Sequence, residues 1–108
     1  MREPQDISLD HLVDALRGAG EITRLRLLAL LKRGDLTVKD LTQILNQSQP
    51  RVSRHLKLLV EADLIERFPE GSWVYYRLSN SSVGRLNQTL LAKLNPADET
   101  LQRDAERL

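Results

Sequence analysis

The segment between Leu41 and Leu78 constrains this chain more than any other, because it places two helices and a hairpin in close succession. Residues 41–45 end a short helix with an apolar face, and the polar residues 46–48 that follow are typical of a turn. Ser48 is a candidate cap for a second helix over Gln49–Glu61. This second helix is basic, since no acidic residue occurs between Ser48 and Val60.

A hairpin is predicted directly after the basic helix. Residues 64–68 and 73–78 favour strands, and Pro69-Glu70-Gly71-Ser72 lies between them as a turn. Together, the helix-turn-helix and the hairpin predict a winged helix-turn-helix, a mainly α fold with a small β-hairpin wing and about five helices. This arrangement is typical of proteins that bind DNA.

The basic helix has one apolar face and one polar face. At about 100° per residue, Leu56 and Leu59 fall within roughly 40° of Val52, and the cations lie elsewhere. Such a helix fits the major groove of DNA with its first turn deepest, so we expect base contacts early in the helix and phosphate contacts further along. The candidate DNA-binding residues are Ser48, Gln49, Arg51 and Ser53 for bases, Arg54 and Lys57 for phosphates, and in addition His55 and Arg67.

These features also have purely structural interpretations. A basic amphipathic helix is most often a solvated surface helix, and it is the preceding turn and the following hairpin that favour DNA binding here. His55 lies near the edge of the apolar face, where a hydrogen-bonded histidine is more common than a ligand. For Trp73 and the two tyrosines of the hairpin, we expect core and cross-strand packing rather than base stacking.

Composition narrows the class of protein. A chain of 108 residues without cysteine is one small domain that can form neither a disulfide nor a zinc–thiolate site, and two histidines are too few for a histidine metal site. We therefore expect no metal and no cofactor. The longest apolar runs fall short of the about 20 residues that span a bilayer. The polar start, Met1–Asp6, lacks the apolar core of a signal peptide, so we expect no membrane and a cytoplasmic location.

Helices are also predicted on both sides of this motif. Capping and apolar spacing indicate helices from Ser8 to about residue 19, from about Glu21 to Lys32, from Val38 to Leu45 and from about Val83 to Leu94, and a further short helix over Thr100–Leu108. We assign residues 1–95 to a winged helix-turn-helix domain for DNA binding and dimerisation. Residues 96–108 are expected to be a tail or the start of a linker helix.

The first helix and the helix after the hairpin carry more leucine than one small core can cover. Because small domains often bury such surface against a second chain, we expect a homodimer. The expected interface residues are Leu9, Leu12, Val13, Leu16, Leu86, Leu90, Leu91 and Leu94.

Three segments closely resemble the ArsR-type winged-helix repressors of bacteria. These are Thr23–Leu28, Ser48–Lys57 and Trp73–Leu78, in the order and spacing of that family, and the resemblance covers about residues 10–94. It implies a dimer, built from the first and last helices, that represses transcription from a two-fold operator in double-stranded DNA. It also implies that binding of an inducer or oxidation releases the DNA.

The sequence departs from the family pattern where a signal would be sensed. Thr37 and Lys39 stand where many members have cysteines, and residues 83–94 contain no His, Cys, Asp or Glu. The tip of the wing, often basic in the family, contains Glu70 instead. The family's usual metal sites are therefore not expected, and the effector is unknown.

A second resemblance leaves an alternative open. Residues 94–104 resemble the junction in two-domain proteins that carry an ArsR-type domain before an S-adenosylmethionine-dependent methyltransferase. The alternative function is thus a regulatory or dimerisation domain of a larger methyltransferase chain. We expect no catalytic role for these 108 residues themselves, because they show no glycine-rich phosphate loop and no nucleophile–base pair.

Overall fold

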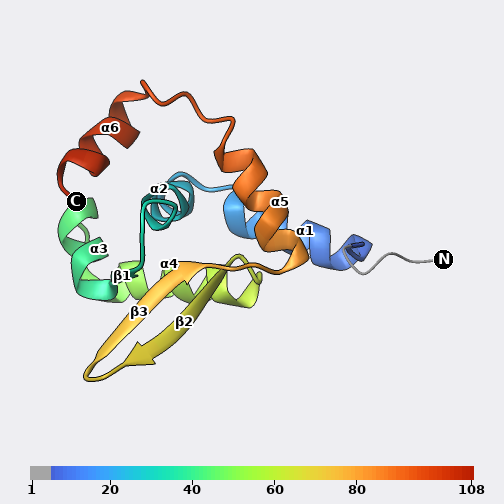
Figure 1. Cartoon of the computed structure of the whole chain (residues 1–108), viewed down its shortest axis with the longest axis horizontal. Coiled ribbons are helices and arrows are strands. Elements are labelled where there is room, and N and C mark those ends of the chain that lie inside the picture. The colour runs from blue at the N-terminus through green and yellow to red at the C-terminus, as the bar shows by residue number, and fades with distance from the viewer. Residues whose placement is uncertain (1–5) are drawn as a thin grey trace.

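The computed structural model describes residues 6–108, so most of the polar start lies outside the described residues. Figure 1 shows a helical layer with a hairpin projecting from one side of it. The elements in chain order are α1 (Leu9–Ala19), α2 (Ile22–Leu31), β1 (Leu36–Thr37), α3 (Val38–Leu45), α4 (Gln49–Glu61), β2 (Ile65–Glu70), β3 (Trp73–Leu78), α5 (Ser82–Leu91) and α6 (Glu99–Glu106). The predicted mainly α winged helix-turn-helix is confirmed, with six helices in the described part of the chain rather than about five.

Local capping explains where most helices begin. The side chains of Ser8, Ser48 and Ser81 each accept a hydrogen bond from a backbone N–H in the first turn of the helix that follows. Thr37 and Asp40 form the predicted reciprocal capping box at the start of α3. As a result, α3 and α4 begin and end at the predicted residues.

The sheet contains one strand that the sequence did not predict. Its order is β1-β3-β2, and the two residues of β1 pair with Tyr75 and Tyr76 of β3. A strand of two residues has no periodicity to detect. The hairpin turn is also tighter than expected, because Pro69 and Glu70 continue β2 and leave Gly71 and Ser72 at the tip. Pro69 is tolerated because β2 is an edge strand, and Gly71 supplies the positive φ of 62°.

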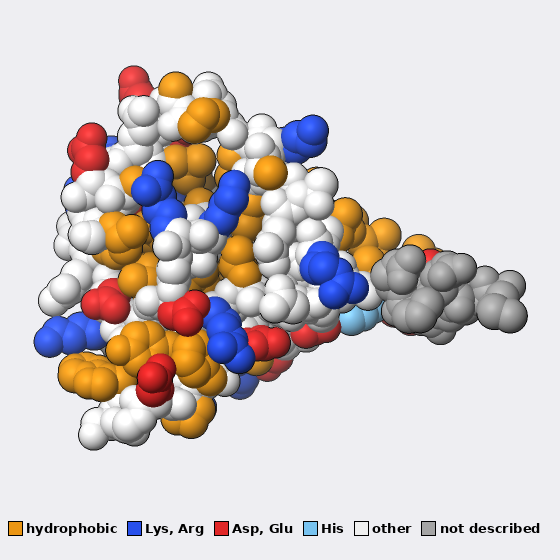
Figure 2. Space-filling view, viewed as in Figure 1, with side chains coloured by type: hydrophobic (Ala, Val, Ile, Leu, Met, Phe, Trp, Pro, Cys, Tyr) orange, Lys and Arg blue, Asp and Glu red, His pale blue; other side chains and the backbone are white. Residues whose placement is uncertain are grey.

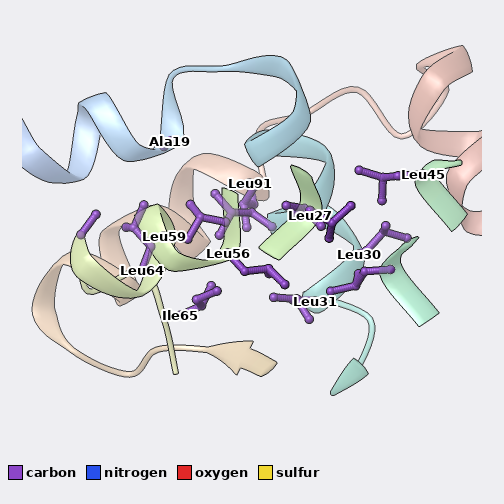
Figure 3. Close-up of a cluster of buried hydrophobic side chains, with 14 of the residues drawn as sticks. Ala19, Leu27, Leu30, Leu31, Leu45, Leu56, Leu59, Leu64, Ile65 and Leu91 are labelled. Carbon is purple, nitrogen blue, oxygen red and sulfur yellow. The ribbon is translucent and has the colours of Figure 1, made fainter. Parts of the chain in front are cut away.

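The core lies between α2, α3 and α4 and extends to the base of the wing. Figure 3 shows leucines from α2 and α4 meeting there, with Leu45 of α3 at one end and Leu64 and Ile65 at the other. Leu27, Leu28, Leu41, Val52, Leu56 and Leu59 have no exposed surface. A Cβ at Gly18 would lie 2.8 Å from the Cβ of Ala62, so this glycine lets α1 approach the end of α4 closely. The packing fixes the orientation of α4.

The chain after α5 folds back along the helical layer. Residues 92–98 form an arch that carries α6 past α2 to the vicinity of α3 (Figure 1). Two contacts attach it: Asp104 pairs with Arg26 of α2, and the Nη1 of Arg107 donates to the carbonyl oxygen of Ile44 at 3.0 Å. The short helix expected over Thr100–Leu108 is confirmed as α6, shifted towards the N-terminus by one or two residues.

Candidate nucleic-acid interface

The helix-turn-helix is formed by α3, the residues 46–48 and α4. Asn46 ends α3 in the left-handed conformation, with φ 54° and ψ 45°, which turns the chain sharply. Ser48 then caps α4, and Pro50 lies in its first turn, where a missing N–H costs little. Because Leu41, Ile44 and Leu45 of α3 and Val52, Leu56 and Leu59 of α4 are all buried, the opposite face of α4 is directed to solvent.

The exposed face of α4 carries most of the predicted DNA-binding residues. Ser48, Gln49, Arg51, Arg54 and Lys57 are exposed, and Ser53 is half-buried. The Nε2 of Gln49 donates a hydrogen bond to the Oγ of Ser53 at 2.6 Å, which orients the Gln49 amide at the start of the helix. Within residues 6–108, no acidic side chain forms an ion pair with Arg51, Arg54 or Lys57. We call the exposed side chains of Arg51, Arg54 and Lys57 the basic ridge. This ridge is accessible to an anion.

His55 differs from the other predicted contacts, because it is only 7% exposed. Its Nδ1 lies 3.2 Å from the Nη1 of Arg24 in α2, and the Nε of Arg24 donates to the carbonyl oxygen of Gly18 at 2.6 Å. A cation can donate only, so Nδ1 accepts and His55 is neutral in this arrangement. Burial and this hydrogen bond direct His55 towards α2 and disfavour the predicted DNA contact, which stays a prediction. Its face of α4 packs towards α1 and α2, as the structural interpretation of a hydrogen-bonded histidine predicts.

The surroundings of His55 favour its neutral form. Burial lowers the pKa of His55, and Arg24, Arg54 and Arg51 lower it further, while Glu21 acts in the opposite direction. Glu21 itself is the cap of α2 and accepts from the backbone N–H of Arg24 at 2.9 Å. Burial raises the pKa of Glu21, but hydrogen bonds from the backbone N–H groups of Arg24 and Thr23 and the charge of Arg24 act against it, so the net pKa is lowered. The cluster joins α1, α2 and α4 behind the basic ridge.

The wing offers fewer free cations than α4. Arg67 is exposed on β2, as a DNA contact requires, whereas Arg77 donates to Glu66 at 3.0 Å and covers the ring of Phe68 at 4.4 Å. Tyr75 stacks on Phe68, with 5.7 Å between ring centroids, so the expected cross-strand packing is confirmed there. The expectation was wrong for Trp73, which lies opposite Glu70 near the tip and is 55% exposed.

The predicted dimer residues differ in how exposed they are. Leu9, Val13 and Leu16 of α1, Leu86 and Leu90 of α5, and Leu94 just beyond it are exposed, and α1 packs against α5. Leu12 is half-buried. Leu91, only 3% exposed, belongs to the core of its own chain, which disfavours the interface role predicted for it. On α5, Leu91 shares the inward face with Val83 and Asn87, whereas Leu86 and Leu90 share the outward one.

Arg24 is the residue of this region whose role sequence reasoning missed. It lies within the segment Thr23–Leu28 that resembles the family, but an arginine on an amphipathic helix gives no local signal that it supports another helix. Only the contact across 31 residues to His55 shows this role.

Two further properties bear on function. In residues 6–108, no cluster of three or more His, Cys, Asp or Glu side chains is arranged to hold a metal ion. Over the same residues, every helix is too short or too polar to cross a bilayer. The expectation that the protein lacks a metal remains a prediction.

Comparison with known proteins gives one consistent family. The sequence model described as "Bacterial regulatory protein, arsR family" matches residues 22–67, from the start of α2 into β2. The arsenical resistance operon repressor of Escherichia coli is 52% identical over 58 residues, which span 53% of this chain and 50% of that repressor. The arsenic resistance transcriptional regulator ArsR1 of Pseudomonas putida is 40% identical over 87 residues, covering 80% of this chain and 68% of that protein.

Solved structures agree with these relatives. The homodimeric winged helix-turn-helix DNA-binding domain Mb0332 of Mycobacterium bovis, described as a possible ArsR-family transcriptional regulator, superposes with a TM-score of 0.71. It is 28% identical, and the match covers 87% of this chain and 84% of that one. The match extends well beyond the helix-turn-helix itself. Taken together, the fold, the basic α4 and these relatives show that the chain belongs to the ArsR family of bacterial regulatory proteins.

Proposed function

We propose that this protein is a sequence-specific DNA-binding transcriptional regulator, acting as a homodimeric repressor on a two-fold operator in the cytoplasm and without catalytic activity of its own. The observation that carries the proposal is the basic ridge of α4, in which Arg51, Arg54 and Lys57 are exposed and have no acidic partner within residues 6–108. A helix placed in this way by a helix-turn-helix presents its first turn to base edges and its later cations to phosphates.

The exposed leucines of α1 and α5 support the homodimer. Leu9 is 78% exposed, Leu16 is 52% exposed and Leu90 is 48% exposed, which leaves a large apolar surface on one side of the molecule. Complete burial of a leucine contributes about 1.5–3 kcal/mol, so several of them can hold two copies together. A two-fold axis through this surface would place the two α4 helices in successive major grooves, about 34 Å apart.

The methyltransferase alternative receives no support from the relatives in Escherichia coli and Pseudomonas putida, which are regulators. The division of the chain at residue 95 also stays a proposal. Since α6 packs on α2 and α3, we propose that residues 96–108 act together with the DNA-binding domain.

The experiment that tests this function begins with sequencing of genomic fragments that the protein retains, which identifies its DNA site. Binding to that duplex is then measured over a range of salt concentrations. Arg54→Ala should weaken binding to all sequences and lower the salt slope by about one unit, because one phosphate is no longer neutralised. Arg103→Ala, which removes an exposed arginine of α6 far along the chain from α4, is the matched control and should change neither.

A single result would contradict the proposed docking of α4. If Arg54→Ala and Arg103→Ala had the same affinity and the same salt slope, the basic ridge would not lie against DNA.

A further inference from the structure

A cavity of about 580 Å³ lies between α2, the end of α5 with the arch that follows it, and α6. Arg26, Ala29 and Leu30 of α2, together with Lys32 and Arg33 just after its end, form one side of this cavity. Leu101 and Ala105 of α6 line it as well. Its volume lies within the about 300–1,000 Å³ that is typical of small-molecule sites.

The lining of the cavity combines apolar and basic groups. Leu94 and Leu101 supply apolar surface, the nearly buried Leu30 and Leu91 add little to it, and Arg26, Lys32 and Arg33 supply positive charge. Figure 2 shows basic side chains standing beside apolar ones in the hollowed upper part of this face, where Figure 1 places α2 and the arch. The cavity therefore suits a ligand that has both an apolar body and a charged group.

The balance of charge decides the sign of that group. Two acidic residues line the cavity, Asp104 and Glu106. Both carboxylate oxygens of Asp104 already accept hydrogen bonds from Arg26. Lys32 and Arg33 are exposed at the end of α2, and within residues 6–108 neither forms an ion pair. With Glu106 set against Lys32 and Arg33, the lining keeps one net positive charge, so an anionic group can reach two cations without displacing an existing partner.

We infer that this cavity binds a small organic acid, whose apolar body packs on Ala29 and Leu101 and whose carboxylate lies at Lys32 and Arg33. The site is separate from the basic ridge of α4 and from the exposed leucines of α1, and it shares Leu94 with the predicted dimer residues. Its walls nevertheless include α6, which contacts α3 through Arg107 and the Ile44 carbonyl. A role of the acid as an effector of DNA binding would rest on the proposed function, whereas binding of the acid does not.

The test uses 2-naphthoate as the probe and the uncharged 2-naphthamide as its matched comparison. Binding to the full chain is measured by calorimetry and by backbone amide shifts in NMR. The acid should shift the signals of Ala29, Leu101 and Ala105, and it should bind at least about fivefold more tightly than the amide, because a charge-assisted contact exceeds a neutral one.

Variants locate the site. The double substitution Lys32→Gln and Arg33→Gln should weaken the acid about five- to tenfold and leave the amide unchanged. Arg103→Gln, an exposed arginine of the same α6 that does not line the cavity, should leave both unchanged. Ala29→Trp should fill the cavity and prevent binding of both probes. Since the two exposed cations can be changed without disturbing the core, the test does not depend on the tryptophan variant folding.

Three results would overturn the inference. Equal affinity for the acid and the amide would remove the role of the cations. Equal reductions in affinity for the acid in the Lys32/Arg33 variant and in Arg103→Gln would mean that the acid responds only to the overall charge of the protein. If the amide signals of Ala29, Leu101 and Ala105 did not respond to either probe but shifted on dilution of the protein, a second copy of the chain would occupy the cavity.

The DNA arm of the experiment is separate. If naphthoate lowers the affinity of the wild type for its DNA but not that of the Lys32/Arg33 variant, the acid site is a regulatory site. If the wild type binds naphthoate with unchanged DNA affinity, the regulatory role fails and the binding site stands. If no DNA is bound at all, the proposed function fails, and the calorimetry still decides the site.

Discussion

Arg26 and Asp104 form a two-bond ion pair between residues 78 positions apart in the chain. The Nε and Nη2 of Arg26 lie 2.8 and 2.9 Å from the two carboxylate oxygens of Asp104. The Asp104 side chain is 2% exposed and that of Arg26 is 15% exposed, so the pair is largely shielded from water. The hydrogen bond with Asp104 raises the pKa of Arg26 above its ordinary value. This pair holds α6 against α2.

We predict that Asp104→Asn detaches α6 before it unfolds the domain. Removing one partner of a buried pair costs about 3–5 kcal/mol, because the other charge stays buried without compensation. Since α6 is a terminal element held by few groups, the cost should appear as local opening. Hydrogen exchange should accelerate in Leu101–Glu106 and stay unchanged in α4. Arg103→Gln serves as the control, and similar protection of α6 in both variants would contradict the prediction.

The buried His55 should make the protein less stable in mild acid. In the folded state burial lowers the pKa of His55 below 6.5, its ordinary value, whereas in the unfolded chain it returns to 6.5. As the pH falls through 6.5, the unfolded state takes up the proton first, so the free energy of unfolding decreases until the pH passes the lowered pKa. Stability is thus fully present above pH 6.5 and decreases below it.

Urea unfolding between pH 5 and 8 measures this effect, and His55→Gln is the matched variant, because its amide oxygen can still accept from Arg24. The decrease below about pH 6.5 should be smaller in the variant than in the wild type. An NMR titration should place the pKa of folded His55 below 6.5. A value above 6.5 would mean that Glu21, rather than burial, dominates its environment.

Substitutions early and late in α4 should have different effects on DNA binding. Arg51→Ala and Gln49→Ala should each relax sequence preference at one base pair, at a cost of about 1–3 kcal/mol for a good two-bond contact. Lys57→Ala should weaken all sequences equally and reduce the salt slope. The measurement is a binding competition among operators that carry single base changes. If Arg51→Ala weakened every operator by the same factor, Arg51 would contact phosphate instead of a base.

A charge placed on the exposed leucine face should separate the dimer. In Leu90→Glu, a carboxylate would have to be buried at the contact between copies, which costs far more than the apolar contact contributes. Light scattering should find a dimer for the wild type and a monomer for the variant at micromolar concentration. Leu108→Glu places the same charge on a leucine that is 52% exposed outside α1 and α5, and it should stay dimeric. A monomeric wild type would contradict the proposed assembly.

Metal ions and arsenite should leave DNA binding unchanged at micromolar concentration. Zinc sites use about four thiolate, imidazole or carboxylate ligands, and the chain has no cysteine and two histidines. Titration with zinc, cadmium and arsenite measures the response. Release of DNA that disappears in His11→Ala or His55→Gln would show that this prediction is wrong.

Much of the local structure could be predicted from the sequence, because the interactions that determine it join residues close together in the chain. The caps of α1, α3, α4 and α5 are serine or threonine side chains bonded to the first turn that they precede. The α3–turn–α4 unit, the hairpin and the exposed cations of α4 follow from the same local signals. For this reason most of the candidate site could be predicted without its geometry.

The features that could not be predicted from the sequence depend on contacts between residues far apart in the chain. Leu90 and Leu91 are neighbours of the same type, yet one is exposed and the other is core, because the packing of α5 against α1 and the core decides which of its sides is covered. Arg24 contacts His55 on the buried side of α4, and Arg26 holds α6 against α2. In each case local signals in the sequence indicate which helix forms and which side chains it carries. Which of those side chains meet depends on the folded chain, because burial and charge pairing come from the neighbours that folding brings together.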